Sequence, residues 1–304
     1  MNKLCMGMVA SLLAGATFAA APASACEFRV EGDNALWNAG RYNPFVRDNV
    51  FEERFLSVEN TTNQDCNLTV SVTSPGLSRN VMKASDSTDS LRYSLYERST
   101  GTPISADSGR GAGGFSSFSV PLRPFEKRQL RFGLNIPAGQ LVEAANYSQA
   151  LAFDFEDRRT GERSTVNMGV EATVPPLASI SLAGQVGARG RRAGFVNLGE
   201  LTTGKRVTDR TVAIRTVGTS PYRVNVESEN NGYLVRDGRN DDWKIDYMLF
   251  LDENPMFDNG GTGELRFNES AQTRLISVAF QIGEADSVRA GTYSDVITIS
   301  IAPL

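Results

Sequence analysis

The chain of 304 residues contains no histidine. A Ser-His-Asp triad and a histidine-ligated metal site are therefore both excluded. Paired carboxylates such as Asp241 and Asp242 could in principle perform acid–base chemistry, but adjacent residues in a strand point apart and acidic loops are usually only solvated. We therefore expect no enzymatic activity and no cofactor. A secreted enzyme would need a catalytic cluster that the sequence does not offer.

Two segments match ligand-binding motifs only in part. Residues 109–114 fit G-x-G-x-x-G, but a dinucleotide site needs a helix after the glycines, and the strand-like FSSFSV follows here. Residues 252–264 carry carboxylates at alternate positions, yet they lack the glycine and the closing glutamate of a calcium loop at the required spacing. We interpret both segments as solvated loops.

Positive charge is not in excess, since 31 Lys and Arg face 35 Asp and Glu. This balance argues against nucleic acid as a partner.

Long apolar runs are also scarce. The one run, from about Met6 to Ala20, is short and alanine-rich for a membrane anchor. Lys3 precedes it and an A-x-A cleavage site at 23–25 follows, so residues 1–25 are predicted to be a secretory signal peptide.

Cysteine is rare, and only Cys26 and Cys66 remain after the predicted signal peptide. In an exported protein such a pair predicts a disulfide. A bridge closing a loop of about 40 residues would stabilise the fold by roughly 3–4 kcal/mol in the chain-entropy model. Cleavage after Ala25 would make Cys26 the first mature residue. A lipid-anchored N-terminal cysteine is therefore an alternative, although such sites usually carry a larger aliphatic residue where Ala23 stands.

Apolar and polar residues alternate along the whole mature chain, with frequent Gly, Asn, Asp and Pro between the alternating segments. This pattern is typical of a β-sandwich.

The chain also repeats itself. Residues 68–72 and 91–101 match 222–226 and 245–255 at an offset of 154, and residues 130–155 match 276–301 at an offset of 146. We therefore predict two copies of one β-domain, residues 26–175 and 176–304.

The two cysteines disappear together in the second copy. At the offset of 154, Cys26 corresponds to Ile180 and Cys66 to Ser220. Two residues that are lost as a unit are expected to be bonded to each other in the copy that has them.

The two copies end differently. After its strand at 151–155, the first copy turns at Gly161 and adds a second alternating strand over 166–174. The second copy has the counterpart of the first strand in Ile297, Ile299 and Ile301, and only three residues follow. Because an open strand edge promotes aggregation, we expect another chain to supply the last strand. The alternative is that the second copy pairs this strand internally.

Several segments together resemble the spore coat protein U domain: AGTYSDVITISI at 290–301, IDYMLFLD at 245–252, and a CEF…NPF start at 26–45 with a second cysteine at 66. The resemblance is strongest over about 195–304 and is carried mainly by the repeat over 26–174. That domain occurs in the pilins and tip subunits of archaic chaperone–usher pili. It implies an incomplete immunoglobulin-like sandwich to which a periplasmic chaperone lends a strand. The outer-membrane usher then exchanges that strand for the N-terminal extension of an adjacent pilin.

The resemblance further implies a tip subunit. Cys26 follows the predicted cleavage site directly, so no strand-length segment is left to donate to a neighbour. Residues 26–175 would then be an adhesive domain at the cell surface, and residues 176–304 a pilin domain. The missing cysteine pair of the second copy departs from the family pattern. The alternative is a structural coat or envelope protein that polymerises without specific adhesion.

Ligand contacts are expected among features of the first copy that the second lacks. Tyrosines 93, 147, 247 and 293 recur in both copies, which indicates a structural role. The ligand itself is not predicted. Apolar side chains on loop tips would suit a hydrophobic or sugar surface, although each could instead fold back onto its own core. The candidates are Trp37, Leu77, Met82, Phe115 and Phe118. At the offset of 154 the counterpart of Trp37 is Arg191.

Overall fold

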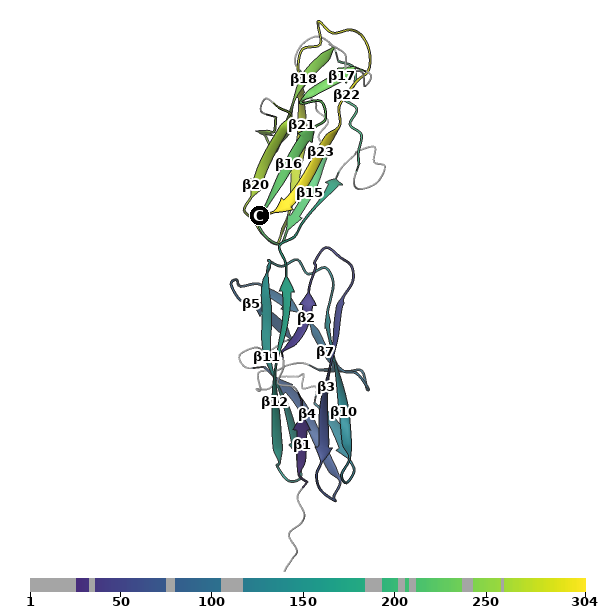
Figure 1. The fold of residues 1–304 in the computed structure, drawn as a ribbon, viewed down its shortest axis with the longest axis vertical. Coiled ribbons are helices and arrows are strands. Elements are labelled where there is room, and N and C mark those ends of the chain that lie inside the picture. Colours follow the sequence, from purple (N-terminus) through teal and green to yellow (C-terminus); the bar gives the residue numbers. More distant parts are fainter. Residues whose placement is uncertain are drawn as a thin grey trace, which may run out of the picture.

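The computed structural model describes residues 26–32, 36–74, 80–104, 117–183, 193–201, 206–207, 212–236, 243–257 and 260–304. The regular structure in these ranges is entirely β-strand, arranged in two sandwiches that lie end to end (Figure 1). Each sandwich has its own hydrophobic core. Within these ranges there is no helix of the length and apolarity needed to cross a membrane. The prediction of an all-β fold with two sandwiches is confirmed.

The first sandwich consists of two sheets. One has the strand order β1-β3-β10-β7-β8 and the other β2-β12-β11-β4-β9, with β5 beside β11 and β6 beside β5. The strands are β1 (Phe28–Glu31), β2 (Trp37–Arg41), β3 (Val50–Asn60), β4 (Cys66–Thr73), β5 (Val81–Ala84), β6 (Ser90–Arg92), β7 (Ser94–Glu97), β8 (Thr102–Ile104), β9 (Phe118–Leu122), β10 (Lys127–Ile136), β11 (Ala145–Asp157) and β12 (Arg163–Val174).

The predicted hairpin at the end of the first sandwich is present. β12 pairs antiparallel with almost all of β11, from Ala145 opposite Val174 to Glu156 opposite Arg163. Gly161, at a φ of 77°, lies in the connecting turn, where only glycine adopts this conformation without strain. The other edge of β12 pairs parallel with β2. The last strand of this sandwich is therefore held on both sides.

The second sandwich has a large sheet of order β13-β15-β21-β18-β17-β22 and a small sheet of order β20-β16-β23, with the short strands β14 and β19 beside the large sheet. Its strands are β13 (Ala178–Ala183), β14 (Arg206–Val207), β15 (Val212–Gly218), β16 (Tyr222–Ser228), β17 (Tyr233–Arg236), β18 (Lys244–Leu251), β19 (Asn254–Pro255), β20 (Thr262–Phe267), β21 (Gln272–Ile282), β22 (Tyr293–Ser294) and β23 (Ile297–Pro303).

The internal repeat holds at the level of strand register. In the first sandwich Phe153 of β11 pairs with Val72 of β4. In the second sandwich Ile299 of β23 pairs with Val226 of β16. These two pairs are related by the offsets found in the sequence, 146 and 154. Strands β11 and β23 are therefore equivalent, as are β4 and β16.

A polar cluster also recurs at equivalent positions: Tyr93, Gln149 and Ser74 in the first sandwich, and Tyr247, Asp295 and Ser228 in the second. Tyr93 donates to Gln149 at 2.7 Å, and Gln149 donates to Ser74 at 2.9 Å. Burial raises the pKa of the Tyr93 hydroxyl far above its usual value. The recurrence supports the structural role expected for these tyrosines.

The short connection between the sandwiches is fixed by hydrogen bonds. Leu177 donates its N–H to Oγ1 of Thr219 at 2.8 Å, and Ala144 donates its N–H to the carbonyl oxygen of Thr219 at 2.6 Å. Ser270 of the second sandwich donates to the carboxylate of Glu143 in the first at 2.6 Å. The junction is therefore held by contacts from both sandwiches and from the connection itself.

Candidate strand-accepting groove

Strand β23 lies at the edge of its sheet. One edge pairs with β16, from Ile297 opposite Ser228 to Pro303 opposite Tyr222. The equivalent strand β11 pairs with β4 on one side and with β12 on the other. Among the described residues, no strand of the second sandwich takes the place beside β23 that β12 has beside β11.

The burial of β23 reflects this difference. Ile297, Ile299 and Ile301 point toward the core but are only half-buried, and they alternate with exposed residues. Their counterparts in the first sandwich are at most 1% exposed: Leu151, Phe153 and Phe155. The same apolar row is therefore covered in one sandwich and accessible in the other.

We define the candidate groove as the incompletely covered apolar side chains of β23 and of β13, a strand of the other sheet that contacts β23. Ala178, Ile180 and Leu182 are half-buried and pack against the same core as the isoleucines of β23. β13 pairs with β15 on one side, and within the described chain its other edge is unpaired. Apolar side chains from both sheets therefore line the groove.

The segment 196–201 is the counterpart of β2. Trp37-Asn38-Ala39-Gly40 and Val196-Asn197-Leu198-Gly199 form the same local turn. The N–H of each glycine binds the side-chain oxygen of the asparagine two residues earlier, at 2.6 Å for Gly40 and 2.9 Å for Gly199. Both glycines have a positive φ, 75° and 80°, which favours glycine there. The two segments are related by an offset of 159.

The two equivalent segments differ in what lies beside them. In the first sandwich β2 pairs parallel with β12. In the second, Val196 and Leu198 pack against the core as Trp37 and Ala39 do, but the segment has no described strand beside it. The segment 196–201 is therefore the counterpart of the strand that flanks β12 in the first sandwich.

One end of the apolar row carries a carboxylate, Asp295, in place of Gln149. Its oxygens accept hydrogen bonds from the hydroxyls of Ser228, at 2.5 Å, and Tyr247, and from the N–H groups of Asn230 and Val296. Burial and the hydrogen bond to this carboxylate raise the pKa of Tyr247 far above its usual value. Four donors satisfy the carboxylate, so an apolar strand can cover it without leaving the charge unpaired.

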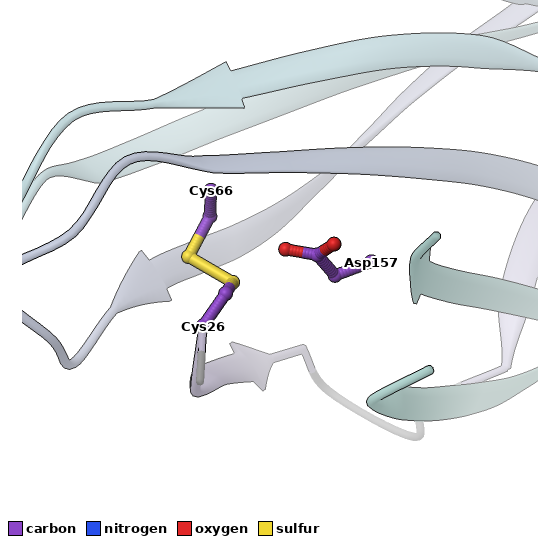
Figure 2. A group of neighbouring side chains, drawn as sticks. All are labelled: Cys26, Cys66 and Asp157. Atoms are coloured by element: carbon purple, nitrogen blue, oxygen red, sulfur yellow. A yellow bond between two sulfur atoms is a disulfide. The ribbon is translucent and has the colours of Figure 1, made fainter. Parts of the chain in front are cut away.

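The predicted disulfide is present between Cys26 and Cys66, with 5.5 Å between their Cα atoms (Figure 2). It ties the residues that precede β1 to the first residue of β4, and so joins the two sheets of the first sandwich. Because Sγ of Cys26 is used in this bond, it is not free to carry a lipid. This geometry argues against the alternative of a lipid-anchored Cys26.

The loop-tip positions expected for two adhesive candidates are wrong. Trp37 lies in β2 and is 1% exposed, and Met82 lies in β5 and is fully buried. Trp37 is matched by Val196 rather than Arg191 because the offset changes to 159 at this point, and both side chains serve the core. Phe118 is half-buried in β9, with its ring 6.1 Å from that of Phe132. Leu77 and Phe115 lie outside the described residues.

The first sandwich instead exposes an aromatic face, which we define as Phe51, Phe55 and Tyr96. Phe51 and Phe55 are 41% and 44% exposed on the outer side of β3. The rings of Phe51 and Tyr96 stack with 6.0 Å between centroids. Tyr96 lies over Gly133, where an added Cβ would come within 2.6 Å of the tyrosine ring. The alternation of Leu56 and Val58 could have predicted that Phe51 and Phe55 point outward.

Charged side chains frame the aromatic face. The guanidinium of Arg98 lies 5.2 Å from the Phe51 ring centroid, and that of Arg131 lies 5.3 Å from the Phe55 ring. Glu53 bridges the two arginines at 3.0 and 3.2 Å. Exposed aromatic rings beside hydrogen-bonding charges can contact a ligand through apolar and polar groups at once.

No family model and no curated protein matches this chain. Among solved structures, the chain is similar to the chaperone–tip adhesion subunit pre-assembly complex CsuC–CsuE of the archaic chaperone–usher Csu pili of Acinetobacter baumannii. The TM-score is 0.47 at 16% identity, over 90% of this chain and 99% of that chain.

It is also similar to the CupB6 tip adhesin of Pseudomonas aeruginosa, with a TM-score of 0.37 at 10% identity over 91% and 94% of the two chains. The third example is CfaE, the adhesive subunit of CFA/I fimbria of enterotoxigenic Escherichia coli. Its TM-score is 0.38 at 13% identity, over 88% and 93%.

Proposed function

We propose that this protein is the tip adhesin of a chaperone–usher pilus, and that its second sandwich accepts a strand from another chain. The observation that carries the proposal is that, among the described residues, β23 has an unpaired edge where the equivalent strand β11 pairs with β12. A periplasmic chaperone would occupy the groove first. An adjacent pilin subunit, delivered at the outer-membrane usher, would then replace it on the way to the cell surface.

The energetics favour an inserted strand. Fully burying an isoleucine stabilises a protein by about 1.5–3 kcal/mol. Because Ile297, Ile299 and Ile301 are half-buried, covering them would add roughly 1 kcal/mol each. The inserted backbone could also form hydrogen bonds with β23 on one side and with 196–201 on the other. By analogy with β12, it would run antiparallel to β23 and parallel to 196–201.

Co-purification tests the strand-accepting half of this proposal. We expect the exported full chain to be recovered from the periplasm bound to a second protein, and to aggregate when that protein is removed. Chemical cross-linking followed by peptide mapping should join the partner to residues in β23 and in 196–201. Recovery of a stable free monomer with a protease-resistant second sandwich would contradict the proposal.

Adhesion is assigned to the first sandwich, because its last strand is already in place and the aromatic face is accessible. We expect the double variant Phe51→Ala and Phe55→Ala to reduce binding at least about 10-fold, since each lost exposed ring removes on the order of 1 kcal/mol of contact. The measurement is binding of the purified complex to immobilised glycans and to an uncoated apolar surface.

Phe125→Ala is the matched control, since Phe125 is 66% exposed outside the aromatic face. Equal losses in both variants would contradict a role for this face. Absence of any binding by the unsubstituted protein would favour the structural coat protein instead.

A further inference from the structure

Asp157, the last residue of β11, is a buried carboxylate with an incomplete set of partners. It is 2% exposed. Oδ1 accepts the N–H of Arg159 at 2.8 Å, whereas Oδ2 is buried and has no hydrogen-bond partner among the described residues. Burying an ionised carboxylate is costly unless it is paired or fully hydrogen-bonded. Oδ2 of Asp157 therefore needs a hydrogen-bond donor.

The side chain of Asp157 lies beside the disulfide (Figure 2). One carboxylate oxygen and the two Sγ atoms of Cys26 and Cys66 all lie within 4.8 Å of one another. A disulfide sulfur has no hydrogen to donate. It is also not a thiolate, the form in which cysteine binds metals. The bridge itself therefore does not satisfy the carboxylate.

Two nearby cationic side chains have other partners. Arg159 donates to the carbonyl oxygen of Asp65 at 3.1 Å, and Arg163 pairs with Glu156 at 2.8 Å. In the described part of the chain, Asp157 takes part in no ion pair. A counter-ion, if there is one, must come from another group.

Asp157, like the two cysteines, is replaced by a different residue type in the second copy of the repeat. At the offset of 146 its counterpart is Pro303. The second sandwich thus lacks the carboxylate as well as both cysteines. This joint absence links the role of Asp157 to the end of the chain that the disulfide holds.

We propose that Asp157 is the counter-ion of an α-ammonium group on Cys26, created by cleavage of the chain after Ala25. Hydrolysis of the Ala25–Cys26 peptide bond consumes one water and leaves a carboxylate on Ala25 and an amine on Cys26. That amine is mostly protonated at neutral pH. It lies three bonds from the Sγ atom that is next to Asp157, and Cys26 is fully buried, so the ammonium needs a partner too.

The ion pair would link the new N-terminus on Cys26 to Asp157 at the end of β11, next to the disulfide. The backbone carbonyl oxygen of Glu27, the next residue, accepts the N–H of Thr61 at 3.0 Å, so the residue that follows Cys26 is also held in place. An uncleaved chain has a neutral amide at this position, and Asp157 stays without its counter-ion. Removal of residues 1–25 is therefore expected to give Asp157 its counter-ion and to stabilise the first sandwich.

The test is a cycle of two changes in the exported full chain. One is Asp157→Asn, and the other places an extra alanine before Cys26 in the mature protein, which moves the ammonium away. Thermal unfolding is followed in the transition that shifts when the disulfide is reduced, since this transition belongs to the first sandwich. We expect each change to lower its midpoint by at least about 5 °C, and the two together to cost no more than one alone.

Asp65→Asn is the control, because Asp65 is an exposed carboxylate near the same end of the sandwich and should leave the midpoint unchanged. If Asp157→Asn leaves the midpoint unchanged or raises it, the carboxylate has no counter-ion and the proposal fails. Intact mass must also place the mature N-terminus at Cys26. Should the variant not fold, acetylation of the unsubstituted protein decides: the native Cys26 amine must react more slowly than the amine of the extended chain.

Discussion

Adding a strand after Pro303 is expected to turn the second sandwich into a soluble, independent unit. In the first sandwich, residues 158–174 form the turn and β12, and they follow Asp157. Pro303 is the residue equivalent to Asp157 at the offset of 146. Appending residues 158–174 directly after Pro303 would therefore place the copied strand in the same register beside β23.

In this register Met168 of the copied strand faces Ile297, and Val166 faces Ile299, as they face Leu151 and Phe153 in the parent hairpin. Covering the isoleucines and adding backbone hydrogen bonds should raise the free energy of unfolding of the second sandwich by on the order of 5 kcal/mol. Size-exclusion chromatography should show a monomer without a bound partner. Urea unfolding gives the stability.

The control for this extension is the same appended segment with aspartate at the positions of Val166 and Met168. It keeps the length and the turn but places two charges against the apolar row, so we expect this extended chain to aggregate, as we expect of the chain without an extension. If the chain without any extension is itself a stable monomer, the groove is already closed and the interpretation of β23 as an accepting edge is wrong.

Ile299→Asp is expected to abolish strand acceptance while leaving the first sandwich intact. Ile299 lies in the middle of the apolar row, opposite Val226. A carboxylate there would be buried without a partner once a strand covers it, which should weaken the complex by at least about 100-fold. The exported variant should therefore be recovered without its partner or be degraded.

Ser300→Asp is the matched control for this variant. Ser300 is the next residue along β23 and is exposed on the outer side. The same charge at this position should change partner binding by less than about 3-fold, because it stays in water. Similar losses for both substitutions would mean that the edge of β23, rather than the floor of the groove, is the sensitive feature.

Much of the groove could be predicted from the sequence because it depends on local alternation. The period of two placed Ile297, Ile299 and Ile301 on one face. The offset of 146 identified the missing hairpin by comparison with the first copy. The structure places the three isoleucines on the inward-facing side of β23, half-buried and beside an unpaired edge. That this edge receives a strand from another chain stays a prediction.

The counterpart of β2 in the second sandwich, residues 196–201, was missed. Segment 196–201 has too few alternating residues to indicate a strand, and its relation to β2 uses an offset that occurs nowhere else in the alignment. Its counterpart Trp37 was assigned to an exposed loop, although it is buried. Conversely, Phe51 and Phe55 are apolar residues of the kind usually found in a core, but their side chains lie exposed on the outer face of β3.

The sequence by itself determined the all-β class, the repeat, the disulfide pair and the row of isoleucines, because each follows from which residues occur and where they stand along the chain. Only the tertiary structure decided that Trp37 is buried, that Val196 and Leu198 pack against the second core, and that Asp157 lies beside the disulfide. The reason is physical. Side-chain burial and the pairing of charges depend on the strand that lies opposite, and in this fold that strand comes from a distant part of the chain.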